Sequence, residues 1–488
     1  MLKVKEKVIM KKIISMILAI TIAFTLSASV YGTSEKDARI PTIVVSGMDF
    51  TGMRIDLGKE TERNLLGEIK VEDILLTVAT GLFKTVLTMS ADGLTSAIFD
   101  YAADLFKGYS CDENGDSVYD VSPHNSYPLA VENYDNLALA DDDSSAEKGV
   151  IKSCIEAFGA DRTYFYYYDW RLDPFDNADG LNELAEKAMA DAGADKINII
   201  CCSMGGVETI AYMTEYGTDQ INSCIFLCST VNGAYVVSDI LQGNIELTAN
   251  SALNFLTDLA GEEMETLMLI LRYTGIGYLV GGAADLLVDS LKEGAFNEVL
   301  KPDFATMPVL WALVLPDEYE AAKKYCFEGE ETKYAKLIEK AEKLQDMMKN
   351  RDAMLDNAVK KGMKIAYVSN YNKPCVPVYT RSETQGDGVL ETALMAGGAT
   401  VSDIGKTLKV EPGKYISPDK IIDASTCTYP DYTWFVKDAP HIACRYDSTY
   451  SDFIIYLITS ETQPTITSNP LYPQFMYADE VQNVYALT

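Results

Sequence analysis

The chain has 488 residues, of which 48% are hydrophobic, and its 72 acidic residues outnumber its 41 basic ones to give a formal net charge of −31. This length and hydrophobicity predict a compact protein with more than one domain, or one large domain with insertions, and argue against a disordered chain. The negative charge argues against binding to nucleic acid and against bulk attraction to anionic membranes.

The first residues have the composition of an export signal. A segment with five lysines (1–12) precedes an apolar stretch at 13–28, and small residues follow. This order predicts a secretory signal peptide over residues 1–32, cleaved after Ser29 or Gly32. The alternative is an uncleaved anchor, although the apolar stretch is short for a spanning helix. Both interpretations predict a bacterial protein that is secreted or held at the extracellular surface.

Strand and helix patterns alternate through the first half of the chain. The predicted elements are a strand at 40–47, a helix-rich stretch at 68–107, a helix at 145–158, a strand at 162–170, a helix at 180–193, a strand at 196–202, a helix at 207–217 and a strand at 223–230. Alternation of this kind predicts an α/β fold with a mostly parallel central sheet and helices on both faces.

The alternation stops after the fourth of these strands. Residues 238–360 have an almost entirely helical pattern, and a strand pattern returns at 363–370. Helices inserted between two sheet strands can form a cap, so we predict a core in two parts, 38–237 and 361–488, with a helical cap at 238–360. The alternative is a helical layer without a gating role. The apolar stretch at 260–290 would either cover a lipid-binding cleft or touch a membrane, or it would belong to an ordinary core.

A serine stands between a predicted strand and a predicted helix in INIICCSMGGVETIAYM (197–213). A tight strand–serine–helix turn exposes the serine oxygen at the carboxyl end of a sheet, next to a helix N-terminus that favours developing negative charge. The usual pattern is G-x-S-x-G, and this chain has Cys201 and Gly205 at the two small positions. We therefore predict that Ser203 is a nucleophile; the alternative is a structural turn serine.

A nucleophilic serine needs a base, and the chain has only two histidines, His124 and His441. In this type of fold the order along the chain is serine, acid, histidine. His441 follows the serine and lies in a loop-like run before a final helix at 448–459, whereas His124 precedes the serine in a polar turn segment. We predict that His441 is the base and that His124 is a surface histidine.

The acid is expected between the serine and the base, after the returning strand. Asp387 lies between two glycines, which let the backbone bend and bring a carboxylate close to an imidazole. Such a carboxylate sets the tautomer and the orientation of the histidine and stabilises the imidazolium. Asp403 and Asp423 are the rival candidates, and a turn aspartate without a catalytic role is the alternative for Asp387.

An oxyanion hole needs two backbone N–H groups. One is expected from Met204, the residue after the nucleophile, and the second from the loop that follows the first core strand, at 46–52. We predict that Met48 supplies the second N–H, with Asp49 as the alternative.

Four segments resemble the lecithin:cholesterol acyltransferase-like branch of the α/β-hydrolases, which includes lysosomal phospholipase A2. IPTIVVSGM (40–48) resembles its strand and oxyanion loop, and YYYDWRLDP (166–174) resembles its tyrosine–aspartate–tryptophan–arginine segment. CSMGG (202–206) is similar to its nucleophile elbow, with Cys202 where the family usually has histidine. GDGVL (386–390) is similar to its acid loop.

The resemblance implies an α/β-hydrolase fold and acyl transfer from lipid esters to water or to an alcohol. Ser203 would form the acyl-enzyme, and His441 would pass the proton to the leaving alcohol and then activate water. Asp169 and Arg171 of the resembling segment would either bind substrate or form a buried structural ion pair between strand and cap. Two other functions are weighed beside the esterase: a peptidase or amidase on the same fold, and a catalytically inactive surface protein that binds a partner.

The sequence predicts no metal and no cofactor. The ten cysteines form no disulfide framework, and four of them lie in apolar runs where buried free thiols are expected: Cys201, Cys202, Cys224 and Cys228. With two histidines and no CxxC pair, a zinc cluster is not expected. The acidic stretch at 111–120 is interpreted as a solvated turn, with a calcium loop as the alternative, although it lacks the terminal bidentate glutamate. The expected partners are an ester or lipid substrate and a lipid surface in transient contact with the cap.

Overall fold

The computed structural model describes residues 40–48, 52–67, 80, 100–123, 146–245, 296–376 and 379–488. The predicted signal peptide, Asp49, His124 and the apolar stretch at 260–290 lie outside the described residues.

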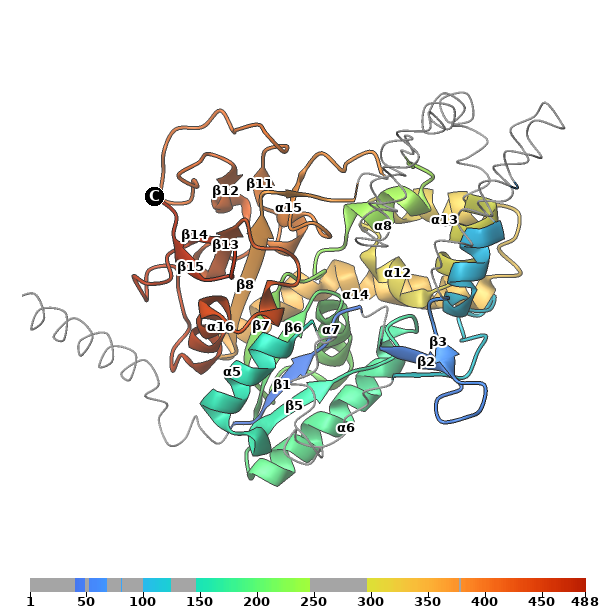
Figure 1. The fold of residues 1–488 in the computed structure, drawn as a ribbon, viewed down its shortest axis with the longest axis horizontal. Coiled ribbons are helices and arrows are strands. Elements are labelled where there is room, and N and C mark those ends of the chain that lie inside the picture. Colours follow the sequence, from blue (N-terminus) through green and yellow to red (C-terminus); the bar gives the residue numbers. More distant parts are fainter. Residues whose placement is uncertain are drawn as a thin grey trace, which may run out of the picture.

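An eight-stranded sheet forms the centre of the described part of the chain, in the order β15-β14-β13-β8-β7-β6-β1-β5 (Figure 1). Its strands are β1 (Thr42–Val45), β5 (Thr163–Tyr166), β6 (Ile197–Cys202), β7 (Ile221–Leu227), β8 (Lys364–Tyr371), β13 (Thr433–Lys437), β14 (Phe475–Ala478) and β15 (Val484–Ala486). All neighbouring pairs are parallel except β14 with β15. The prediction of a mostly parallel α/β fold is therefore confirmed.

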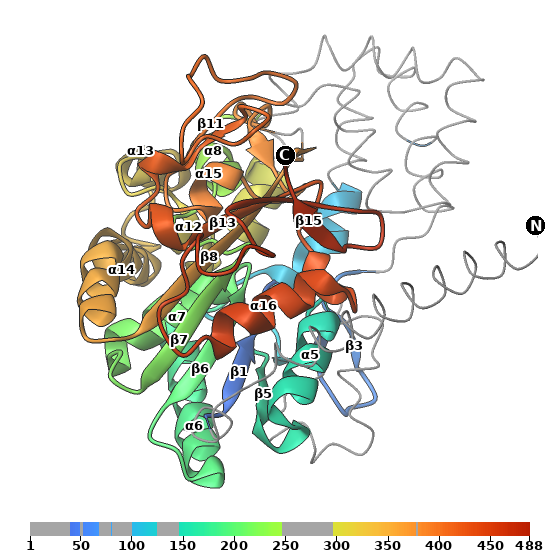
Figure 2. The same cartoon turned by 90° about the vertical axis from the view of Figure 1, so that its left-hand side faces the viewer.

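Helices cover both faces of this sheet, as expected for parallel strands that are buried on both sides. One face carries α5 (Lys148–Phe158) and α16 (Thr449–Thr459), which pack on each other (Figure 2). The other carries α6 (Pro174–Ala192), α7 (Gly205–Tyr216) and α14 (Ala335–Lys360), with α7 in contact with both of the others. Helix α14 comes from the segment predicted as a cap, yet it packs on α7 over the sheet.

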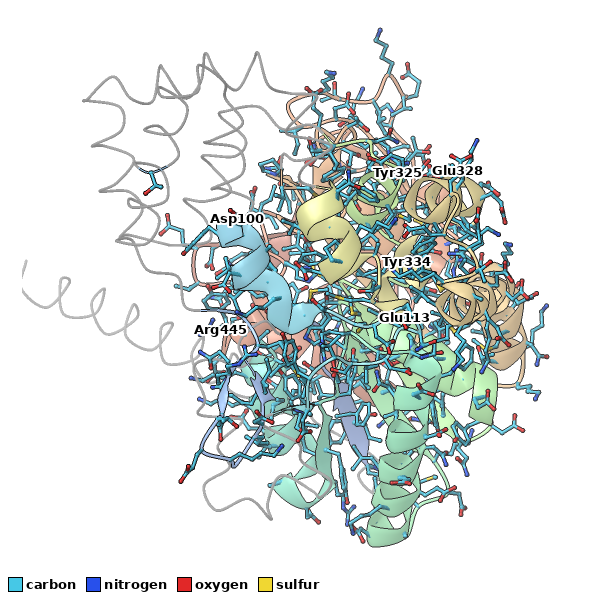
Figure 3. The ribbon with its side chains drawn as sticks, turned by 90° about the vertical axis from the view of Figure 1, so that its right-hand side faces the viewer. Asp100, Glu113, Tyr325, Glu328, Tyr334 and Arg445 are labelled. Atoms are coloured by element: carbon cyan, nitrogen blue, oxygen red, sulfur yellow. The ribbon has the colours of Figure 1, made fainter. Side chains whose placement is uncertain are left out.

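Four further described helices lie to one side of the sheet: α8 (Tyr235–Leu241), the π-helix η5 (Phe296–Phe304), α12 (Pro308–Leu313) and α13 (Tyr319–Phe327). The short helix α15 (Thr392–Met395) instead contacts β8. Helix α8 contacts α12 and α13, and η5 packs against residues 100–109, where the Phe106 and Phe304 ring centroids are 5.4 Å apart. Figure 3 views this side of the molecule, with Asp100 labelled at the start of the neighbouring helical turns. No described helix has the length and apolar character needed to span a membrane.

Three smaller sheets complete the described strands. They are β3-β2-β4 (Arg63–Asn64, Met53–Ile55 and Val121–Pro123), β9-β10 (Lys373–Pro374 and Gln385–Gly386) and β11-β12 (Thr400–Val401 and Ile422–Asp423). Asp387 follows β10 directly and forms an isolated bridge with Lys373 of β9.

Local sequence signals explain where several elements begin and end. Helix α6 begins earlier than the predicted residue 180, because the Asp173 carboxylate accepts a hydrogen bond from the Phe175 N–H (3.0 Å) and Pro174 occupies the first helical position. It ends at Gly193, which adopts the left-handed conformation at φ 61°.

Two predictions of local structure were wrong. The aromatic strand predicted at 162–170 ends at Tyr166, because the chain turns at Asp169–Arg171 to form an ion pair described below. The loop-like run before His441 begins with strand β13, whose apolar side chains Trp434, Phe435 and Val436 are fully buried. This strand delivers His441 to the carboxyl end of the sheet.

Candidate active site

Ser203 lies in the turn between β6 and α7, at the carboxyl end of the sheet. Its φ angle is 50°, a left-handed conformation that is strained for a residue with a side chain. Backbone hydrogen bonds hold the turn: the Ser203 N–H donates to the Leu227 carbonyl (3.1 Å), and the Ser203 carbonyl accepts from the Thr230 N–H (3.0 Å). Strain that is held in this way presents the serine hydroxyl at the end of the strand.

The two small positions around the serine have different requirements. A Cβ atom on Gly205 would lie 2.7 Å from the carbonyl oxygens of both Val45 and Ser46, so a side chain there would displace the end of β1. Cys201 is fully buried, and its Sγ donates to the Ile225 carbonyl of β7 at 3.3 Å. The departure from G-x-S-x-G at position 201 is therefore accommodated between two strands.

The structure brings together the three side chains predicted as nucleophile, base and acid. The Ser203 Oγ lies 2.9 Å from Nε2 of His441, and Nδ1 of His441 lies 2.6 Å from Oδ2 of Asp387. The His441 side chain is 13% exposed and the Asp387 side chain is fully buried. The hydroxyl thus faces an imidazole whose other nitrogen is paired with a carboxylate.

The loop after β8 fixes the direction of the Asp387 carboxylate. Its Oδ1 accepts hydrogen bonds from the N–H groups of Val389 (3.0 Å) and Leu390 (2.8 Å), which leaves Oδ2 for the histidine. Gly388 follows at φ 102°, a conformation that favours glycine. The Asp387 carbonyl also accepts from the His441 N–H (2.9 Å), so two hydrogen bonds join the acid to the base.

The rival acids are engaged elsewhere. Asp403 forms an ion pair with Lys406 at 2.8 Å, and the Asp423 carboxylate accepts from the N–H and the hydroxyl of Ser425. Of the three candidate aspartates, Asp387 is therefore the one that is hydrogen-bonded to His441.

Opposing effects act on the pKa of His441. Burial lowers this pKa, but the charge and hydrogen bond of Asp387, together with the charge of Glu147, outweigh burial and raise the pKa above its ordinary value of 6.5. A raised pKa makes the neutral imidazole a stronger base, and it requires a higher pH to keep the imidazole neutral.

The two predicted oxyanion donors each adjoin the serine or a residue that packs against it. Met204 follows Ser203 directly, and Met48 follows Gly47, where an added Cβ would lie 2.7 Å from the Ser203 Cβ and 3.3 Å from its Oγ. The backbone of this loop therefore packs directly against Ser203. In the part of the chain that the structure describes, the backbone N–H groups of Met48 and Met204 donate to no protein acceptor.

The thiol beside the serine is poorly suited to compete as the nucleophile. Cys202 is 4% exposed, and contact with the Cys444 thiol and burial raise its pKa well above the ordinary range. Because the thiolate is the reactive form, a neutral buried thiol is inert. All ten cysteines are free and buried, as expected for Cys201, Cys202, Cys224 and Cys228.

The Asp169–Arg171 ion pair is buried. Arg171 is fully buried, and its guanidinium donates to both oxygens of Asp169 at 2.9 and 2.7 Å. Its remaining donors reach the carbonyls of Gly108 (3.2 Å) and Tyr109 (3.3 Å) and the Ser117 hydroxyl (2.7 Å). Arg171 therefore ties the segment after β5 to residues 108–117.

The described residues include no group of three or more His, Cys, Asp or Glu side chains placed to hold a metal ion. Within the acidic stretch 111–120, the Asp112 carboxylate accepts from the N–H groups of Asn114 (2.8 Å) and Asp116 (3.0 Å). Asp116 pairs with Lys340 at 2.8 Å.

Sequence reasoning missed two buried carboxylates near the site. Glu147 accepts a hydrogen bond from the Gly47 N–H beside the serine, and Glu391 lies four residues after Asp387 and contacts α8. Neither glutamate belongs to a motif. The available signal for Glu391 was its place in the same loop as Asp387, whereas nothing in the sequence relates Glu147 to residue 47.

Comparison with known proteins adds little to this geometry. No family model and no curated protein matches the chain. Among solved structures, the chain is similar to the crystal structure of the Tle4-Tli4 complex, with a TM-score of 0.33 and 11% identity, over 68% of this chain and 75% of that one. Similarity at this level indicates neither the fold family nor the activity of this chain.

Proposed function

We propose that the protein is an exported serine hydrolase of the α/β-hydrolase fold that cleaves carboxylic esters, with lipid esters as the expected class, or transfers their acyl group. The observation that carries this proposal is the continuous hydrogen-bonded series from Ser203 through His441 to Asp387. The sequence resemblance to acyltransferase-like lipases and the predicted signal peptide support the substrate class and the export.

The topology supports the same proposal. The three side chains follow β6, β8 and β13, and all three strands are parallel members of one sheet. Ser203, Asp387 and His441 also occur in the chain order expected for this class of hydrolase. In addition, β1 lies between β5 and β6, so the loop after β1 and the turn at Ser203 meet where the strand order reverses, which is where open α/β sheets bind ligands.

In the proposed mechanism, Ser203 Oγ attacks the carbonyl carbon of the ester while Nε2 of His441 takes the hydroxyl proton. The backbone N–H groups of Met48 and Met204 stabilise the negative oxygen of the tetrahedral intermediate. The carbon–oxygen bond to the leaving alcohol then breaks, and the alcohol takes the proton from His441. Water, activated by the same histidine, attacks the acyl-enzyme, releases the acid and restores the serine hydroxyl.

Asp387 has a supporting role in each step. Because its Oδ2 pairs with Nδ1 of His441, the proton stays on Nδ1 and Nε2 is free to accept. Its negative charge then stabilises the imidazolium that forms when His441 takes the serine proton. The complete series supports an enzyme over a catalytically inactive binding protein.

The test is labelling of the purified protein with a fluorophosphonate probe, beside turnover of short and long p-nitrophenyl esters. We expect labelling and ester turnover in the wild type, and loss of both in Ser203→Ala and His441→Ala. Asp403→Asn is the control and is expected to behave as the wild type, because the Asp403 carboxylate is 48% exposed and pairs with Lys406 instead of His441.

Each outcome of this test distinguishes between functions. Faster turnover of long esters than of short ones would support a lipase, and the reverse would support an esterase of small substrates. Labelling that depends on Ser203 without ester turnover would favour the amidase alternative. Absence of labelling in the folded wild type would contradict the proposal.

A further inference from the structure

A buried glutamate lies at the meeting point of the loops that surround Ser203. Glu147 precedes α5 and is 4% exposed. Its Oε1 accepts hydrogen bonds from the Gly47 N–H (3.1 Å) and from the Ser46 hydroxyl (3.3 Å). Ser46 and Gly47 begin the loop that follows β1, which we call the β1 loop and which carries the Met48 N–H. The Glu147 carboxylate is therefore hydrogen-bonded to the backbone immediately before the expected oxyanion donor.

The same short segment also packs against the loop that carries the base. The Cys444 thiol donates to the Ala146 carbonyl at 3.2 Å. An added Cβ on Gly149 would lie 2.2 Å from the Tyr446 carbonyl oxygen and 2.8 Å from that of Cys444. The backbone of residues 146–149 is thus in close contact with the loop that follows His441, and Glu147 lies between that loop and the β1 loop.

The β1 loop also accepts a hydrogen bond from a neutral side chain, that of Tyr168. The Tyr168 hydroxyl donates to the Ser46 carbonyl at 2.9 Å, and Tyr168 is 4% exposed. Glu147 and Tyr168 therefore fix the same loop through different atoms, and only Glu147 adds a charge.

We propose that Glu147 is a positioning residue of the active site, which fixes the β1 loop that presents the Met48 N–H and places a second negative charge beside His441. This inference rests on the proposed function for its consequence in catalysis. In the free protein, the charge of Glu147 adds to that of Asp387 in raising the pKa of His441. Among the described residues, the titratable and polar groups around this pair include Ser46, Tyr168, Cys202, Ser203, Asp387, Cys444 and the neighbouring Lys148.

Two substitutions separate the hydrogen bond from the charge. Glu147→Gln keeps an oxygen that can accept from the Gly47 N–H but removes the negative charge. Glu147→Asp keeps the charge but shortens the side chain by one methylene, so that it no longer reaches the Gly47 N–H in the observed backbone. Tyr168→Phe is the matched control for the loop, because it removes a hydrogen bond to the same loop without changing a charge.

The first measurement is the histidine titration by NMR, which needs no substrate. The chain has two histidines, so the His124→Gln variant assigns both signals. A negative charge nearby favours the imidazolium, so its removal lowers the pKa. We expect Glu147→Gln to move the pKa of His441 down by about half a unit or more, and Glu147→Asp and Tyr168→Phe to leave it near the wild-type value. An unchanged pKa of His441 in folded Glu147→Gln would overturn the proposal that the charge of Glu147 acts on His441.

The second measurement is the rate constant for fluorophosphonate labelling as a function of pH. His441 must be neutral to accept the serine proton, so the rate is full above the pKa of His441 and falls below it. The fall should therefore move to lower pH in Glu147→Gln. At the high-pH plateau we expect Glu147→Asp and Tyr168→Phe to be slower than the wild type by about tenfold, because a misplaced donor loses part of its oxyanion stabilisation.

These outcomes can be told apart from failure of the proposed function. Without labelling of the wild type, the proposed function fails, and the NMR titration still tests the effect of Glu147 on His441. With labelling of the wild type, a wild-type plateau rate in folded Glu147→Asp would overturn the positioning role alone. If Glu147→Gln does not fold, as judged by thermal unfolding, Glu147→Asp and Tyr168→Phe still decide the positioning role.

Discussion

Two groups of hydrogen-bonded polar residues, Ser203–His441–Asp387 and Asp169–Arg171, differ in how completely their donors and acceptors are paired. Every guanidinium nitrogen of Arg171 donates to a described acceptor, and the side chain is fully buried. At the other site the hydrogen-bonded series ends on the hydroxyl of Ser203, a residue that is partly exposed. The next residue, Met204, has a backbone N–H that donates to no acceptor among the described residues.

This difference distinguishes a candidate active site from a buried ion pair that only stabilises the fold. A fully paired ion contributes to the structure, because every donor already has its acceptor and no atom is left to bind a substrate. A hydrogen-bonded series that ends on an open hydroxyl, next to an unused backbone N–H among the described residues, can bind a substrate and react with it. Four predictions test this comparison, from the largest expected effect to the smallest.

Removal of the nucleophile or the base should have the largest effect. We expect Ser203→Ala and His441→Ala each to lower kcat for a p-nitrophenyl ester by about 10⁶-fold, because members of one relay act as a unit. The double variant should lose no more than either single one. An additive loss in the double variant would mean that the two residues act independently, contrary to the hydrogen bond between them.

Neutralisation of the acid should come next. Asp387→Asn is expected to lower kcat by about 10⁴-fold, since an amide favours the wrong tautomer of His441 and cannot stabilise the imidazolium. Asp403→Asn is the matched control, and its kcat should equal that of the wild type. The kcat values of the two variants, measured side by side, check the assignment of the acid; a large loss in Asp403→Asn instead would reverse it.

Disruption of the Asp169–Arg171 pair should lower the free energy of unfolding and leave ester turnover by the folded protein unchanged. Arg171→Met leaves the Asp169 charge buried and unpaired, so we expect the free energy of unfolding to fall by about 3–5 kcal/mol. The exposed pair Lys187–Asp191, at 2.8 Å, provides the control, because Lys187→Met should cost about 1 kcal/mol or less. Urea unfolding measures both values. A raised KM with unchanged stability in Arg171→Met would assign Arg171 to the substrate site.

The smallest effect is expected at Glu391, four residues after Asp387, the proposed acid. Its two oxygens accept from the N–H groups of Tyr235 (3.0 Å) and Val236 (3.1 Å) at the start of α8 and from the Tyr379 hydroxyl (2.6 Å). Glu391→Ala should lower the free energy of unfolding by about 1–3 kcal/mol, because buried donors lose their acceptor.

Glu383 lies on the surface of the same loop, and Glu383→Ala should leave thermal unfolding unchanged. A loss of kcat in Glu391→Ala as large as that of Asp387→Asn, at wild-type stability, would show that both carboxylates of the loop act in catalysis.

The sequence predicted the sheet and the three side chains of the relay because these depend on local patterns. Apolar runs such as 197–202 specify buried parallel strands, and the scarcity of histidine left His441 as the base. The chain order placed the acid between serine and base, and two glycines singled out Asp387. A strand break at Tyr166 and the added strands β14 and β15 were not predicted, because turns and edge strands depend on contacts with distant segments.

Only the tertiary structure decided which charges face one another. The Arg171 guanidinium finds its other acceptors more than fifty residues away, at residues 108–117, and Glu147 reaches a loop that lies about a hundred residues earlier in the chain. Periodicity and motif spacing report on neighbours within a few residues, so they carry no information on such pairs. Burial then determines what each charge does, since a carboxylate out of water must find donors, and those donors are set by the packing of whole elements.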